Sequence, residues 1–243
     1  MTSWSYSMYS TAIQCLQKYK LIYIDQVVPE APLSGDLAFG SALHSSLNSI
    51  IKGEDGEQIF EIYWDSYQGK ELEYGRFKWK ELREIGLNFC SKFSRLHASK
   101  YKMEMAEKRL YSEYKGVKLE GTPDFLGSYN GRISLRDFKT SGYNYAKEKA
   151  HVALQLNLYA YLSLSTGETK SIDTLGYTVF NKGSGSIQDL TWDFDEAIMY
   201  SMLDDLVAYC ATFDNRQSFP KNPNACVQGT MKCPFFEQCW SKK

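Results

Sequence analysis

Apolar residues recur at helical spacing through most of the first hundred positions. Over residues 37–51 they fall three and four positions apart, which predicts a helix that carries His44 on its apolar side. Capping candidates followed by spaced apolar residues predict a short helix within residues 3–19, and this helix carries Cys15. A longer helix is predicted over about residues 75–99. The N-terminal part of the chain should therefore be mainly helical.

After about position 101 the pattern changes to short runs in which apolar and polar residues partly alternate, as they do in strands. Asn130-Gly131 separates two of these runs, and Asn-Gly is a strong signal for a two-residue hairpin turn. Residues 123–128 and 132–138 are therefore predicted to form adjacent antiparallel strands.

Helical and strand patterns alternate over the following residues. The predicted helices cover about 145–165 and 194–213, and the predicted strands cover 174–181 and about 187–192. This order predicts an α/β fold with a central mixed β-sheet flanked by helices. We expect one domain over residues 1–243, made of a helical part (1–100), an α/β core (101–213) and a cysteine-rich tail (214–243).

The composition is that of a globular protein. Of 243 residues, 43% are hydrophobic and 15% are aromatic, and the net charge is −1. A protein that coats duplex DNA is usually more basic, and the local excess of positive charge in residues 76–80 and 92–109 is most simply a solvated face. No apolar run approaches the roughly 20 residues that cross a bilayer. We expect a soluble, cytoplasmic protein with no membrane partner.

Two carboxylates and a lysine occupy the predicted hairpin. Asp124 lies near the start of its first strand, and Asp137 and Lys139 lie at the end of its second. Antiparallel neighbours bring such side chains within reach of one another, and carboxylate oxygens suit Mg²⁺ or Mn²⁺. A metal held here could stabilise a phosphoryl transition state, with Lys139 beside the attacking water. The simpler alternative is that Asp124 caps a turn and Asp137 pairs with Lys139 on an exposed strand.

The wider pattern resembles the PD-(D/E)XK nuclease superfamily and, within it, the RecB-like exonuclease branch. Pro123-Asp124 followed by Asp137-Phe138-Lys139 resembles the superfamily signature. Three further matches resemble the branch, and they lie in the expected order: Gly40-Ser-Ala-Leu-His44, Lys139-Thr140 and Gln155-Leu-Asn-Leu-Tyr159. The resemblance implies a restriction-endonuclease-like core and a nuclease activity.

The resemblance also implies a role for each matching residue. His44, Asp124, Asp137 and the carbonyl of Phe138 would hold a divalent metal, and Lys139 would serve the attacking water. Gln155 and Tyr159 would shape the site and contact the DNA strand. Two simpler interpretations remain: His44 as a core histidine, and the helix of Gln155 and Tyr159 as one that only packs on the sheet.

The cysteines form a second pattern. The tail reads Cys-x₆-Cys-x₅-Cys, and a short irregular loop of this kind can wrap its thiolates around one metal centre. An iron–sulfur cluster or a structural zinc needs four thiolates. The fourth candidate is Cys15, far earlier in the chain, whereas Cys90 and Cys210 lie in helical patterns as buried hydrophobic residues. The candidate ligands are therefore Cys15, Cys226, Cys233 and Cys239.

This cysteine pattern resembles the iron–sulfur nucleases of the same branch, such as AddB-type domains and CRISPR-associated adaptation nucleases. There, one cysteine precedes the nuclease core and three follow it, so a [4Fe-4S] cluster joins the N-terminal segment to the tail. The six-residue interval after Cys226 departs from the commoner interval of two, which puts that ligand in doubt. Structural zinc and free thiols are the alternatives, and the run from Cys233 to Phe236 could also be a hydrophobic plug.

Together these features predict a metal-dependent DNA exonuclease that acts on single strands or duplex ends. Its setting would be recombination, repair, spacer acquisition or phage DNA processing, the last in a host cytoplasm. The chain has no P-loop signature, so a helicase or recombination partner would do any unwinding. One alternative is a catalytically inactive DNA-binding or scaffold protein of the same fold, which the intact set of Asp124, Asp137 and Lys139 disfavours. Another is a zinc-stabilised interaction domain unrelated to nucleases.

Overall fold

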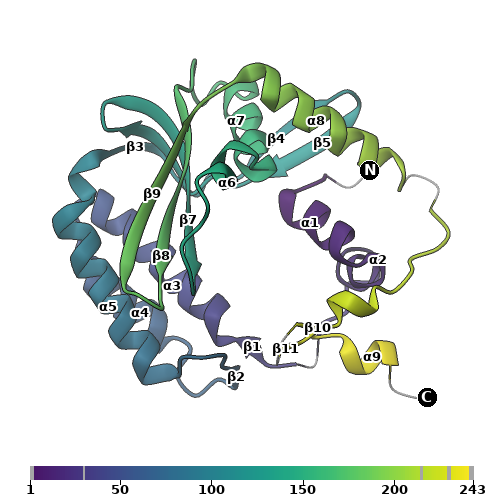
Figure 1. The fold of residues 1–243 in the computed structure, drawn as a ribbon, viewed down its shortest axis with the longest axis horizontal. Helices are drawn as coiled ribbons and strands as arrows, with labels where there is room; N and C mark the ends of the chain where they lie inside the picture. Colours follow the sequence, from purple (N-terminus) through teal and green to yellow (C-terminus); the bar gives the residue numbers. More distant parts are fainter. Residues whose placement is uncertain (1–2, 30, 214–215, 229–230, 241–243) are drawn as a thin grey trace.

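A mixed five-stranded sheet forms the centre of the computed structural model, which describes residues 3–29, 31–213, 216–228 and 231–240 (Figure 1). Its strands lie in the order β3, β6, β7, β8, β9, and only the pair β7 and β8 is parallel. The bounds are β3 (Tyr101–Met105), β6 (Phe125–Tyr129), β7 (Arg132–Ser141), β8 (Thr174–Asn181) and β9 (Ser186–Asp193). The predicted mixed α/β fold is therefore confirmed.

Helices cover both faces of this sheet (Figure 1). The first face, here called the α3 face, packs on α3 (Gly35–Ile51), α4 (Gly56–Asp65) and α5 (Trp79–Leu96). The opposite face, the α7 face, packs on α7 (Leu154–Ser165), with α8 (Glu196–Ala211) behind it. No helix in the described part of the chain is both long and apolar enough to span a membrane.

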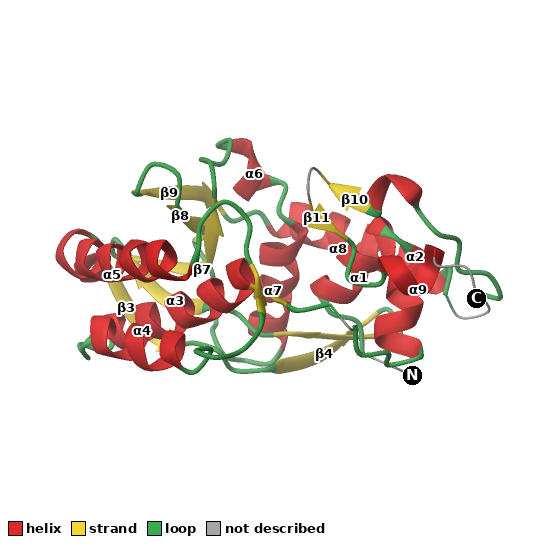
Figure 2. Cartoon of the chain, turned by 90° about the horizontal axis from the view of Figure 1, so that it is seen from below, coloured by secondary structure: helices red, strands yellow, loops and turns green. Residues whose placement is uncertain are grey.

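Smaller elements complete the molecule, and Figure 2 shows them along its length, with α5 toward one end and α9 toward the other. A hairpin of β4 (Leu110–Tyr114) and β5 (Val117–Gly121) packs on α7. The remaining helices are α1 (Tyr6–Gln14), α2 (Leu16–Tyr19), η1 (Lys20–Ile24), η2 (Ala98–Lys100), α6 (Glu148–His151), η3 (Pro223–Ala225) and α9 (Phe236–Trp240). The remaining strands are β1 (Leu33–Ser34), β2 (Leu72–Glu73), β10 (Val227–Gln228) and β11 (Met231–Lys232).

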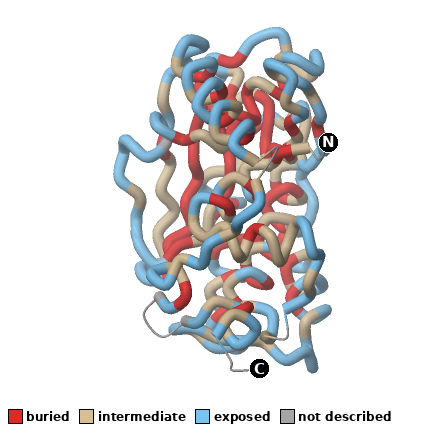
Figure 3. The backbone as a smooth tube through the Cα atoms, turned by 90° about the vertical axis from the view of Figure 1, so that its right-hand side faces the viewer, coloured by how far each residue is buried: buried red, intermediate tan, exposed pale blue. Residues whose placement is uncertain are grey.

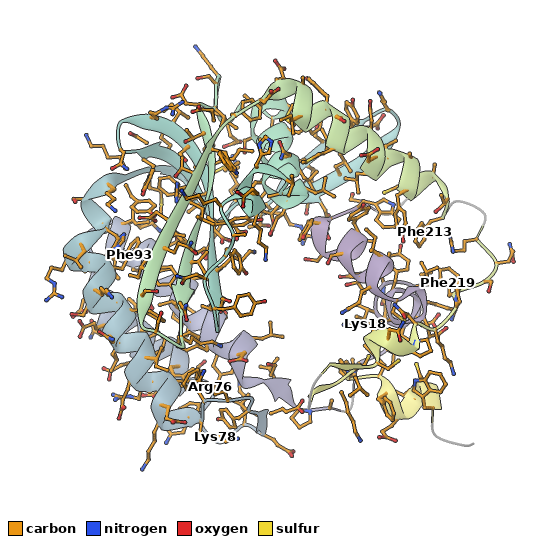
Figure 4. All side chains as sticks on the ribbon, viewed as in Figure 1. Lys18, Arg76, Lys78, Phe93, Phe213 and Phe219 are labelled. Atoms are coloured by element: carbon orange, nitrogen blue, oxygen red, sulfur yellow. The ribbon has the colours of Figure 1, made fainter. Side chains whose placement is uncertain are left out.

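The N-terminal helices and the C-terminal tail lie side by side, opposite the sheet in the ring-like outline of Figure 1. The backbone N–H of Gln17 donates to the carbonyl of Pro220 at 3.2 Å, and Nδ2 of Asn222 donates to the carbonyl of Gln14 at 2.7 Å. Phe213 packs its ring 5.0 Å from that of Tyr19, beside the N-terminal helices in Figure 4. The expected packing of the two segments is thus observed.

Burial is concentrated around the sheet and is sparse in the tail (Figure 3). Among the described residues of the tail, Cys226 and Phe235 are buried. The hydrophobic interpretation of the run after Cys233 therefore holds for Phe235, which is 1% exposed. A tail with so few buried apolar groups gains little from the hydrophobic effect, so other interactions must hold it in place.

The hairpin between β6 and β7 follows the prediction. Asn130 and Gly131 have φ values of 50° and 81°, the left-handed values that a tight hairpin turn requires. The second strand continues beyond its predicted end at Phe138 to Ser141, because β8 pairs with it over that whole length. The helix predicted over 145–165 is instead two helices, α6 and α7.

A buried arginine fixes the sheet directly before Asp137. Arg136 is 0% exposed on the α3 face, where Nη2 donates to the carbonyl of Tyr177 and Nη1 donates to Oγ1 of Thr191, both at 2.9 Å. Its guanidinium also lies 3.9 Å from the ring centroid of Tyr129. These contacts join β7 to β8, β9 and β6. Because successive residues of a strand point to opposite faces, this clamp also fixes the direction of Asp137.

Gly176→Ala is expected to destabilise the protein by about 3 kcal/mol, because it overpacks this clamp. A Cβ at position 176 would lie 2.6 Å from the carbonyl oxygen of Leu190 and 2.8 Å from Cζ of Arg136. Thermal or urea unfolding measures the loss. Gly142→Ala is the matched control, since an added Cβ there meets open space. Equal stability of the two variants would contradict the clamp.

Candidate active site

The residues that the sequence singled out meet at β7. Asp124 lies directly before β6, and its Oδ2 accepts a hydrogen bond from the backbone N–H of Phe138 at 2.8 Å. Asp137 and Lys139 are two positions apart on β7, so both side chains lie on the α7 face. Nζ of Lys139 lies 2.7 Å from Oδ2 of Asp137. The two strands of the hairpin therefore bring both carboxylates and the lysine together.

Helix α7 supplies the other side of this cluster. Nζ of Lys139 donates to Oε1 of Gln155 at 2.9 Å, and Nε2 of Gln155 donates to the hydroxyl of Tyr159 at 3.1 Å. Residues four apart on a helix share one side, so Gln155 and Tyr159 form a continuous polar row. Gly121 of β5 allows the ring of Tyr159 to lie close, because a Cβ there would be 2.6 Å from that ring.

His44 reaches the cluster from α3, on the other side of the sheet. Its Nδ1 lies 3.5 Å from Oδ2 of Asp124, and its ring meets that of Phe138 edge-on at 6.1 Å. Burial lowers the pKa of His44, and the opposing charge of Asp137 does not outweigh it. The imidazole is therefore mainly neutral near pH 7, the form in which a ring nitrogen can bind a metal.

Glu107 is a member of the site that sequence analysis missed. It lies between β3 and β4, and its charge acts on both His44 and Asp124. Its φ is 51°, a left-handed value that is uncommon for glutamate, and its N–H donates to the carbonyl of Pro123 at 2.9 Å. That hydrogen bond places Glu107 beside the start of β6. No spacing in the sequence marks it, because the contact depends on how β3 pairs with β6.

Two carboxyl groups, those of Asp124 and Asp137, share the single positive charge of Lys139. Burial, and then the carboxylate of Asp137, raise the pKa of Asp124 well above its usual range. Burial opposes the charge of Lys139, but its contact with Asp137 holds its pKa above the usual value. Oδ2 of Asp137 is buried, and Nζ of Lys139 lies 2.7 Å from it.

The donors at this site fit a divalent cation. One lysine faces the carboxyl groups of Asp124 and Asp137, and oxygen-rich sets of this kind suit Mg²⁺ or Mn²⁺. Over the described ranges, no three His, Cys, Asp or Glu side chains converge closely enough to hold a metal ion in the present conformation. A bound cation would compensate the repulsion that raises the pKa of Asp124.

Asp124→Asn is expected to raise the melting temperature of the metal-free protein more at about pH 8 than at about pH 4. A carboxyl whose folded pKa is raised costs nothing below its unfolded pKa of about 3.9 and costs most above its folded pKa. The amide removes that cost. Melting curves in a chelator across this pH range measure it, and an equal gain at both pH values would contradict the assigned burial.

Asp204→Asn provides a control of opposite sign for this experiment. A hydrogen bond from Lys115 lowers the pKa of this exposed carboxyl. Its contribution to stability is present above the unfolded pKa and is lost as the pH falls through the folded pKa. The control variant should therefore lose a little stability at about pH 8 and at about pH 4 alike, because the folded pKa of Asp204 lies below both values.

The four candidate cysteines belong to the N-terminal segment and the tail, which are joined by hydrogen bonds. Burial, and then the charges of Cys233, Cys15 and Cys226, raise the pKa of Cys239, against the lowering effect of Lys221. Cys226 is the most enclosed, and its Sγ accepts a hydrogen bond from Nε1 of Trp240 at 3.3 Å. The N-terminal segment and the tail thus carry thiols of the number and kind that a four-thiolate centre uses, and among the described residues no three of them converge closely enough to hold a metal ion in the present conformation.

Comparisons with known proteins concern the family and the fold of this chain. The family model of the PD-(D/E)XK nuclease superfamily matches residues 3–240. The crystal structure named "Putative exonuclease" from Eubacterium rectale is similar with a TM-score of 0.60 and 14% identity, over 92% of this chain and 85% of that one. At this identity the likeness establishes a shared fold.

A second solved structure, named SSO0001, has a TM-score of 0.32 and 14% identity over 71% of this chain and 84% of that one, too low to support an argument. No curated protein matches the chain. The family match extends over nearly the whole sequence and includes every strand of the central sheet. This chain therefore belongs to the PD-(D/E)XK nuclease superfamily.

Proposed function

We propose that this nuclease is a DNA exonuclease that depends on Mg²⁺ or Mn²⁺. The observation that carries the proposal is the contact of Lys139 with both Asp137 and Gln155, next to the carboxyl group of Asp124. Members of this fold that no longer cleave DNA have no need to keep all three charged groups in one cluster. The name of the similar solved structure, an exonuclease, supports the choice of DNA ends over internal sites.

The metal would be held by His44, Asp124, Asp137 and the carbonyl of Phe138. When bound, it would stabilise negative charge on the attacked phosphate and lower the pKa of the attacking water. Glu107 would add a further negative charge to the same site. The neutral imidazole of His44 can supply a nitrogen ligand without first losing a proton.

Lys139 would act on the attacking water and the phosphate. Its raised pKa keeps the ammonium charged at neutral pH, so Nζ would donate hydrogen bonds and would not act as a base in the resting site. Gln155 holds Nζ in place through its Oε1, and Tyr159 holds Gln155 in turn. This chain of contacts would keep the ammonium aimed at the reacting phosphate while a DNA strand moves past.

The cysteines would hold a [4Fe-4S] cluster. The contacts of Gln14 and Gln17 with the tail support this proposal, because they join the segment of Cys15 to the segment that carries the other three cysteines. A cluster would supply the stabilisation that the sparsely buried tail otherwise lacks. Structural zinc would use the same four thiolates.

Digestion from ends is tested with linear and covalently closed circular DNA of the same sequence. Purified protein in Mg²⁺ or Mn²⁺ should release nucleotides from the linear form and leave the circle intact. Linearising the circle with a restriction enzyme should make it a substrate. Equal degradation of both forms would replace the exonuclease proposal with an endonuclease.

A further inference from the structure

A row of tyrosine rings leads from Lys139 to the surface. Nζ of Lys139 lies 6.0 Å from the centroid of the Tyr177 ring. The ring of Tyr177 is 6.0 Å from that of Tyr145, and Tyr145 is 6.4 Å from Tyr143. Exposure rises along the row, from a buried Tyr177 to a Tyr143 that is 70% exposed. The row therefore joins the reactive end of the site to solvent by consecutive aromatic contacts.

Hydrogen bonds from neighbouring strands hold the segment that carries the outer two rings. The side-chain amide of Gln188 accepts from the N–H of Tyr145 at 2.9 Å and donates to its carbonyl at 3.0 Å. Oγ of Ser141 accepts from the N–H of Tyr143 at 3.2 Å. Nδ2 of Asn181 donates to Oδ1 of Asn144 at 2.8 Å. The loop is thus held at Tyr143 by β7, at Asn144 by β8 and at Tyr145 by β9, and these contacts fix the backbone that carries Tyr143.

Positive charge accompanies the row. Nζ of Lys149 lies over the ring of Tyr145 at 3.6 Å, and Lys147 is exposed beside it. Arg76 lies near the same segment. A Cβ added at Gly183 would be 3.7 Å from Nη1 of Arg76 and 2.7 Å from the carbonyl oxygen of Gly142, the residue before Tyr143. Asp124 and Asp137 thus lie with Lys139 at the inner end of the row, and Lys149 lies farther out, over Tyr145. This polarity suits a chain of phosphates that enters from outside.

We propose that Tyr143 and Tyr145, with Lys149, form a stacking platform for unpaired bases of a single-stranded DNA end, and that this platform delivers the strand to Lys139. The inference rests on the proposed function and specifies its substrate. Exposed rings flanked by cations bind single strands by base stacking and by phosphate contacts. Duplex DNA offers Tyr143 far fewer free base faces, because all of its bases except the terminal pair are already stacked on both sides. The platform therefore selects strands that are unpaired at the end being digested.

Binding by the full-length protein in a chelator tests the platform, because no hydrolysis then interferes. The probes are a short fluorescent oligothymidylate, an abasic oligomer with the same number of phosphates, and a blunt duplex. Tyr143→Ala should weaken oligothymidylate binding about tenfold, the effect of losing one stacked base. Tyr143→Phe keeps the ring and should bind within about twofold of the unmodified protein. Binding of the abasic oligomer should be weak and equal in both variants.

Tyr63→Ala is the matched control, since Tyr63 is an exposed tyrosine on α4 at the α3 face. Its binding of all three probes should be unchanged, and the melting temperatures of all variants should agree. The platform is wrong if Tyr143→Ala binds oligothymidylate normally, or if the abasic oligomer binds as tightly as oligothymidylate.

The two proposals can fail separately. A protein that releases no nucleotides in Mg²⁺ or Mn²⁺, yet loses oligothymidylate binding in Tyr143→Ala, would retain the platform and lose the exonuclease activity. A protein that degrades linear DNA, yet binds the abasic oligomer as well as oligothymidylate, would retain the activity and lose the platform.

Discussion

Asp137→Asn and Lys139→Ala are each expected to lower the rate of nucleotide release from linear DNA by about 1,000-fold. Asp137 supplies a buried carboxylate oxygen to the proposed metal, and Lys139 is the cation closest to that oxygen, at 2.7 Å. The two groups also hold each other in place as an ion pair, so loss of either one disturbs the position of the other. The measurement is the initial rate in saturating Mn²⁺, with the fold checked by circular dichroism.

Asp193→Asn is the control for this experiment. It makes the same chemical change on β9, at a carboxylate that is 83% exposed and paired with Arg132. Its rate should equal that of the unmodified protein. Full activity in either Asp137→Asn or Lys139→Ala would show that this cluster is not the catalytic site.

Cys15→Ser and Cys239→Ser are each expected to lose most of the bound iron and to lower the melting temperature by about 10 °C or more. The reason is that ligand binding to a centre formed only in the folded chain is folding free energy. Loss of the centre would release the N-terminal segment from a tail in which few described residues are buried. Iron and sulfide content, measured on anaerobically purified protein beside the melting curve, gives the result.

Cys90→Ser distinguishes a ligand from a merely buried thiol. Cys90 is fully buried in α5, and that burial raises the pKa of its thiol to about 12. Its replacement should cost some stability and no iron. Cys226→Ser should lose iron less completely if another group can take its place. Full iron in a Cys15→Ser, Cys239→Ser double variant would exclude this ligand set.

The centre of the site was predictable because its geometry is local. A hairpin turn at Asn130-Gly131 dictates which residues of β6 and β7 face each other, so Asp124 had to lie near Asp137. The alternation of a strand then puts Lys139 on the same side as Asp137. Gln155 and Tyr159 follow from helical spacing, although their contact with Lys139 depends on how α7 packs on the sheet.

Other parts required tertiary structure. Glu107 enters the site through a left-handed backbone and a hydrogen bond to Pro123, which no periodicity records. Arg136 is fully buried in a strand, where its partners come from the three strands around it. Helix α4 did carry a signal that the sequence analysis overlooked, since Asp55 caps it through the N–H groups of Glu57 and Gln58.

The approach of Cys15 to the tail shows the limit of spacing arguments. More than two hundred positions separate it from Cys226, and only the resemblance to iron–sulfur nucleases suggested their association. In the structure, hydrogen bonds of Gln14 and Gln17 join α1 and α2 to the segment before η3. Association across so long an interval depends on the whole fold between them, and the tail alone carries no pattern for it.

The most direct test of the central claim is the rate of nucleotide release from linear DNA as the Mn²⁺ concentration rises from zero. The acidic cluster around Asp137 predicts no release in a chelator and a saturable rise as the metal binds. The same rate with and without the chelator, or no release at any Mn²⁺ concentration, would contradict a metal-dependent nuclease site at this position.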